Sequence, residues 1–67
     1  MNYKELGFLV LRYRRDNGLT QQEFADKVKL SRNYVCQIER GKAIHLSLAV
    51  LTKVAGGMGV AVKELVG

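Results

Sequence analysis

Four polar side chains that can contact nucleic acid lie close together in the middle of the chain. They are Arg32, Asn33, Tyr34 and Gln37. Arginine can form two hydrogen bonds to guanine, and asparagine or glutamine can do the same with adenine. A short helix that presents such side chains from a compact support has the geometry that reads a DNA major groove. The pattern makes DNA binding the leading hypothesis.

Helix-start signals open two short segments around these side chains. Thr20 and Glu23 have the spacing of a capping box. Ser31 is placed to cap the next helix, and Gly41 is placed to end it. Only positions 29 and 30 remain for the turn between the two helices. This spacing favours a helix-turn-helix over about residues 20–40, with an apolar face of Phe24, Ala25, Val28, Val35 and Ile38.

Three further helical segments are predicted from apolar periodicity and helix signals. The first begins near Asn2 and ends at Gly18, the fourth begins after Ser47, and the last covers Val60 to Val66. The residues expected to break the fourth helix are Gly56, Gly57 and Gly59. The fold class is therefore predicted to be all-α. Residues 1–67 are expected to form one compact five-helix bundle, a single helix-turn-helix domain.

Basic residues concentrate in the first two-thirds of the chain. The net charge is +5, and positions 12 to 42 hold most of the lysines and arginines, whereas the remainder is mainly apolar. This distribution suggests one face for a polyanion and a separate face for packing or for a partner. A solvated charged surface would look the same, so charge alone does not identify a nucleic-acid partner.

The composition also bears on the compartment. The single cysteine cannot form an internal disulfide, which favours a reduced, intracellular setting. No apolar run approaches the roughly 20 residues of a membrane span. Residues 1–5 have no apolar signal-peptide core. We therefore expect a cytoplasmic protein without membrane contact.

Catalytic and metal chemistry find little support in the residue types. Cys36 and His45 are the only nucleophile and imidazole base of the usual kind, and they lie on different predicted segments without an obvious third group. One cysteine and one histidine cannot supply a four-ligand metal site. The glycine cluster near the fourth helix does not match a phosphate-binding loop. No enzyme activity, metal, cofactor or small-molecule ligand is expected.

A set of motifs spread along the chain carries a family resemblance: Gly18-Leu19-Thr20-Gln21, Phe24-Ala25, Leu30-Ser31, Ile38-Glu39 and Gly41. These motifs resemble the helix-turn-helix domain of lambdoid phage repressors and Cro proteins, over residues 7–65. Within that superfamily, residues 30–35 and 38–41 look most like the controller proteins of restriction–modification systems. Those controllers are small, all-helical, dimeric transcription regulators.

The resemblance implies roles for individual residues. The positions that face the bases in the family are Ser31, Arg32, Asn33 and Gln37. The positions that approach the DNA backbone are Gln21, Tyr34, Arg40, Lys42 and His45. The resemblance also implies a partly buried, structural ion pair between Arg14 and Glu39. One departure is Lys29, which stands where the family usually has a glycine. A left-handed non-glycine residue costs roughly 1 kcal/mol.

The last segment is more apolar than a short helix needs for its own packing. Val60, Val62, Leu65 and Val66 could close the bundle, form a two-fold interface, or do both. In the resembling proteins the last helices form such an interface. A dimer would place two recognition helices about 34 Å apart, one turn of DNA, and would bind an inverted repeat.

The leading interpretation is a sequence-specific regulator of transcription that binds double-stranded DNA as a homodimer. A restriction–modification controller that blocks or recruits RNA polymerase fits best. A phage- or plasmid-type repressor, an antitoxin-like protein-interaction domain and a nonspecific DNA-compacting protein remain as alternatives. We expect no partner-binding extension beyond the fold, and this expectation favours direct DNA binding.

Overall fold

Side-chain caps begin four of the five helices in the computed structural model, which describes residues 1–67. Asn2, Thr20, Ser31 and Ser47 each accept a hydrogen bond from the backbone N–H three residues later, at 3.0 to 3.2 Å. Such bonds satisfy N–H groups that have no partner within the helix. At Thr20 the bond is reciprocated by Glu23, whose side chain accepts the Thr20 N–H at 2.8 Å. All four predicted caps are confirmed.

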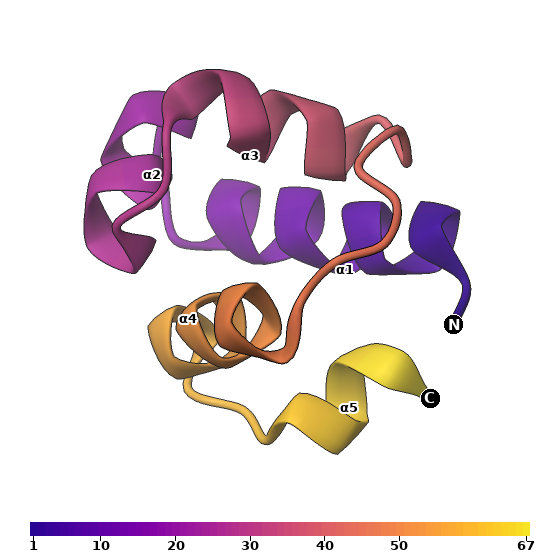
Figure 1. The fold of residues 1–67 in the computed structure, drawn as a ribbon. Coiled ribbons are helices and arrows are strands. Elements are labelled where there is room, and N and C mark those ends of the chain that lie inside the picture. The colour runs from indigo at the N-terminus through magenta and orange to yellow at the C-terminus, as the bar shows by residue number, and fades with distance from the viewer.

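The helices are α1 (Tyr3–Asp16), α2 (Gln21–Val28), α3 (Arg32–Glu39), α4 (Leu48–Met58) and α5 (Val62–Val66). In Figure 1, α1 crosses the middle of the molecule, with α2 and α3 on one side of it and α4 and α5 on the other. The two chain ends lie near each other beside the first turn of α1. The all-α, five-helix prediction is confirmed. None of the helices is long and apolar enough to cross a membrane.

One core joins all five helices. Its members are Leu6, Val10, Phe24, Ala25, Val28, Val35, Ile38, Leu51, Val54, Ala55 and Leu65. Phe24 is fully buried, and its ring meets the Tyr13 ring edge-on with centroids 5.9 Å apart. The predicted apolar face of the helix-turn-helix lies wholly within this core. The buried residues of α3 therefore fix the helix against α1 and α2 and leave its opposite side to solvent.

A glycine allows α1 to approach α3 closely. A Cβ at Gly7 would overlap the backbone carbonyl oxygens of Ile38 and Glu39. The missing side chain lets the end of α3 rest directly on α1. A side chain at this position would push the two helices apart.

The predicted break of α4 at Gly56 and Gly57 is wrong. The helix continues through both residues to Met58, and only Gly59, in a left-handed conformation with φ 71°, ends it. Gly57 faces α2, where a Cβ would overlap Cγ1 of the buried Val28. The contact between α2 and α4 therefore requires a residue without a side chain, and packing outweighs the low helix propensity of glycine.

The final helix is shorter than predicted. It covers Val62–Val66, whereas Val60 lies in the connection from α4, where its N–H donates to the carbonyl of Ala55 at 3.0 Å. The N-terminal end of α5 is satisfied by Glu64, whose carboxylate accepts the Ala61 N–H at 2.8 Å. The short helix closes the bottom of the bundle and depends on the core for its stability.

Candidate nucleic-acid interface

The start of α3 presents polar side chains to solvent. Ser31, Arg32 and Asn33 are exposed, and Tyr34 and Gln37 are half-buried. On the other side of the helix, Val35 and Ile38 are at most 2% exposed. The four residues predicted to face the bases, Ser31, Arg32, Asn33 and Gln37, thus lie on one short helix whose opposite side is anchored in the core. Such a rigid support positions side chains for groove contact.

The turn before α3 has the predicted length but an unusual residue. Lys29 adopts the left-handed conformation, with φ 59° and ψ 44°, and ends α2. Its N–H bonds to the carbonyl of Asp26, and the next N–H, of Leu30, bonds to Ala25 at 3.0 Å. Lys29, which stands where the family usually has a glycine, therefore adopts a conformation that favours glycine, although lysine has a Cβ. These backbone bonds hold the turn in spite of that cost.

The residues predicted to approach the DNA backbone fall into two places. Arg40 and Lys42 are exposed directly after α3, where the Lys42 N–H donates to the carbonyl of Gln37 at 2.9 Å. His45 lies farther along the connection to α4, in a left-handed conformation with φ 56°. Its N–H donates to the hydroxyl of Tyr3 at 3.2 Å, at the start of α1. Sequence reasoning did not single out Tyr3, and 42 residues separate this pair.

Beneath the exposed side of α3, a network of hydrogen bonds connects α1, α2 and α3. Nε and Nη2 of Arg14 donate to the two carboxylate oxygens of Glu39 at 2.8 and 3.0 Å. Nη1 of Arg14 donates to the carbonyl of Leu19 at 3.0 Å. The side chains of Arg14 and Glu39 are only 14% and 6% exposed. The partly buried ion pair implied by the family resemblance is therefore present.

Gln21 also belongs to this network. Its amide Nε2 donates to Oε1 of Glu39 at 3.1 Å, although Gln21 was predicted only as a contact to the DNA backbone. Burial by itself raises the pKa of Glu39. The hydrogen bonds from Arg14 and Gln21, together with the Arg14 charge, lower this pKa by more than burial raises it, so the net shift is downward. The hydrogen bond to Glu39 likewise raises the pKa of Arg14. Both groups are therefore charged at neutral pH.

The four residues predicted for a dimer interface differ in exposure. Leu65 is 5% exposed and belongs to the core, which fits the expectation that this segment closes the bundle. Its part in an interface stays a prediction. Val60 and Val62 are half-buried, and Val66 is 39% exposed. α5 must bury Leu65 to stay on the bundle, which leaves the valines as the candidates for contact with a partner.

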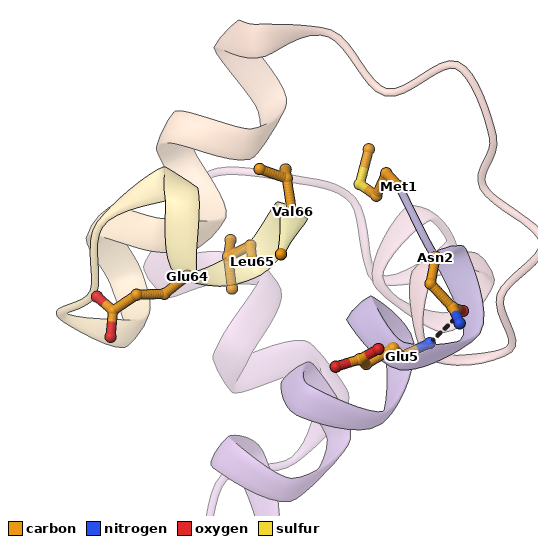
Figure 2. A pocket seen from close by; sticks show the side chains of 7 residues that line it. Met1, Asn2, Glu5, Glu64, Leu65 and Val66 are labelled. Carbon is orange, nitrogen blue, oxygen red and sulfur yellow. Dashed lines mark hydrogen bonds between the residues drawn. The ribbon is translucent and has the colours of Figure 1, made fainter.

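A pocket of about 300 Å³ lies where the two chain ends meet. Figure 2 shows its lining: Met1 and Asn2 before α1, Glu5 in the first turn of α1, and Glu64, Leu65 and Val66 from α5, with Gly67 after them. No group of three or more histidine, cysteine or acidic side chains is placed to hold a metal ion.

Comparison with known proteins agrees with this geometry. The sequence model of the helix-turn-helix family matches residues 10–65. The chain belongs to the helix-turn-helix family. Over 54 residues this helix-turn-helix chain is 43% identical to the immunity repressor protein of Bacillus phage phi105, a match that covers 81% of the chain and 37% of that repressor. The chain thus spans well under half the length of this relative.

Two solved structures resemble the helix-turn-helix fold over nearly its whole length. The N-terminal DNA-binding domain of SinR from Bacillus subtilis superposes with a TM-score of 0.84 at 28% identity, covering 96% of this chain and 93% of that one. The restriction–modification controller protein C.AhdI from Aeromonas hydrophila superposes with a TM-score of 0.82 at 30% identity, covering 94% of each chain. The resemblance to phage repressors and to restriction–modification controllers is confirmed.

Proposed function

We propose that this protein is a sequence-specific regulator of transcription that binds double-stranded DNA. The observation that carries the proposal is the start of α3, where Arg32 and Asn33 are exposed while Val35 and Ile38 anchor the helix. Arginine and asparagine are the side chains that pair with guanine and adenine edges. Further support comes from the SinR domain, which is named as DNA-binding and shares the fold at 28% identity.

In the proposed mechanism, phosphate contacts set the position of α3 and base contacts give specificity. Ser31, Arg32, Asn33 and Gln37 would read base edges. The residues that would contact phosphates are Gln21, Tyr34, Arg40, Lys42 and His45. The net charge of +5 favours approach to a polyanion. Occupancy of a promoter would then block or recruit RNA polymerase.

The proposed active form is a homodimer that binds an inverted repeat. Two copies related by a two-fold axis would place their α3 helices about 34 Å apart, one turn of DNA. Apolar surface for this contact comes from the exposed Val66 and the half-buried Val62 of α5, and from the half-buried Val60 just before that helix. Leu65 supports that surface from within the core.

A restriction–modification controller is the favoured role, because C.AhdI shares the fold across 94% of both chains. A phage-type repressor is the second candidate, and the 43% identity with the phi105 immunity repressor favours it. The two roles differ in the gene that is regulated. Locating the operator in the source genome, beside restriction–modification genes or beside phage genes, would distinguish them.

Selection from a random double-stranded DNA library tests the proposal. It is done at about 150 mM salt, where nonspecific phosphate binding is weakened. We expect enrichment of an inverted repeat with half-sites about one turn apart. If folded protein enriches no sequence, DNA reading is refuted and a protein-interaction domain becomes the better explanation. Enrichment of a single half-site would refute the dimer alone.

A further inference from the structure

Glu39 receives hydrogen bonds from two other helices at once. Arg14 on α1 bonds to both of its oxygens, and Gln21, the first residue of α2, bonds to Oε1 at 3.1 Å. Glu39 itself is the last residue of α3. The Glu39 carboxylate therefore links α3, which carries the candidate base contacts, to the start of α2. That start carries Gln21, a candidate phosphate contact.

The chemistry of the pair determines how the Gln21 amide is oriented. An ionised carboxylate only accepts hydrogen bonds, so it selects the NH₂ end of the amide over the carbonyl end. That NH₂ group has two N–H donors, and Glu39 takes one of them. The second N–H is left over for another acceptor. A phosphate oxygen is an acceptor of this kind, and hydrogen bonds to charged acceptors are the stronger ones.

The Gln21 side chain is already ordered before DNA binds, and this order favours the phosphate contact. A glutamine side chain that is mobile before binding loses rotamer freedom when it contacts a phosphate. Gln21 is half-buried and already bonded to Glu39, and Glu39 is held by two bonds from Arg14. The loss of freedom has therefore occurred during folding and does not weaken binding.

We propose that Glu39, held by Arg14, is a positioning residue for DNA binding, which orients the Gln21 amide so that its second N–H donates to a backbone phosphate. This inference rests on the proposed function and deepens it. It gives the Arg14–Glu39 ion pair a role in binding as well as in stability. Glu39 itself would touch no DNA.

NMR of the unmodified protein tests the inference without any substitution. The probe is a duplex that carries the selected inverted repeat. We expect one side-chain N–H resonance of Gln21 to be protected from exchange before DNA is added, and the other to shift and gain protection afterwards. If the backbone signals of residues 31–37 shift on binding but the Gln21 amide does not, the inference is overturned and the proposed function stands. If neither changes, the proposed function fails.

A double-mutant cycle supplies the quantitative test. Gln21→Ala is expected to weaken binding to the duplex by about tenfold, the effect of one lost hydrogen bond to a charged group. Glu39→Gln is expected to weaken binding in the wild-type background and to cost little further in the Gln21→Ala background. Equal losses in both backgrounds would overturn the inference, because Glu39 would then act independently of Gln21.

Gln22 provides the matched control. It is the neighbouring glutamine on α2, is exposed, and bonds only to Asp26 at 2.9 Å among side chains. Gln22→Ala should leave DNA affinity unchanged. A loss equal to that of Gln21→Ala would indicate a general effect on α2 and would overturn the inference. Thermal unfolding of each variant identifies any that is unfolded, and the NMR test does not depend on those variants.

Discussion

Glu39 links stability to pH through its hydrogen bonds with Arg14 and Gln21. Its pKa in the folded protein lies below the ordinary value of 4.5, since the two partners outweigh the effect of burial. The stability that the charged form contributes is therefore fully present above about pH 4.5 and is lost as pH falls through the folded-state pKa. The fold should weaken in acid for this reason.

Glu39→Gln should be less stable by about 3 kcal/mol at pH 7, because the Arg14 charge stays partly buried without its partner. The variant should also lose part of the acid dependence. Denaturant unfolding between pH 7 and pH 3 measures both effects. If the variant and the wild type lose stability in parallel below pH 5, the acid sensitivity arises from other carboxylates.

Arg32 is the residue on which proposed base reading depends most. Arg32→Ala should cost about 1–3 kcal/mol of binding free energy on the selected duplex and far less on a random duplex. Arg12→Ala is the matched control, since Arg12 is an exposed arginine of α1 that pairs with Asp16 at 3.7 Å. Fluorescence anisotropy at fixed salt measures both variants. An equal loss on both duplexes would mean that Arg32 contacts only phosphates.

At the scale of the helices, two adjacent glycines in α4 have opposite surroundings. A Cβ at Gly56 would meet nothing within 4 Å, whereas one at Gly57 would overlap the buried Val28. Gly56→Ala should therefore stabilise the fold by about 0.5–1 kcal/mol, because alanine favours a helix. Gly57→Ala should destabilise it by about 1–3 kcal/mol, since a β-branched valine in a packed helix has little freedom to move aside.

Thermal and denaturant unfolding of the two variants give the comparison. Each serves as the control for the other, because both change glycine to alanine in the same turn of the same helix. A stabilising Gly57→Ala would show that α2 and α4 can separate without loss, and the account of their packing would be wrong.

At the scale of the whole molecule, α5 has two sides with different roles. Leu65→Ala should destabilise the monomer fold by about 2–5 kcal/mol, because it removes a buried side chain. Val66→Asp should leave the monomer folded, since Val66 is exposed, but should place a charge in the proposed dimer contact. Light scattering at tens of micromolar should then report a dimer for the wild type and a monomer of 7.5 kDa for Val66→Asp. A wild-type monomer under those conditions would exclude the proposed dimer.

Local sequence was sufficient for the starts of the four helices that have side-chain caps and for the length of the turn. Thr20 and Ser31 cap their helices through bonds to residues three positions away, so the sequence contains both partners. The spacing of the two caps leaves positions 29 and 30 for the turn, and Lys29 ends α2 there. The exposure of Arg32 and Asn33 likewise follows from the apolar positions of α3 on the other side. The candidate base contacts could therefore be predicted.

Only the tertiary structure decided the features that depend on distant neighbours. Gly57 remains helical because Val28, on another helix, leaves no room for a side chain. Leu65 is in the core because α5 folds back on the bundle, whereas apolar character alone fits a core or an interface equally. Gln21 meets Glu39 across 18 residues of chain. A short window of sequence shows the type of each side chain. It does not show which distant residue that side chain will contact, because packing in the folded chain determines the partner.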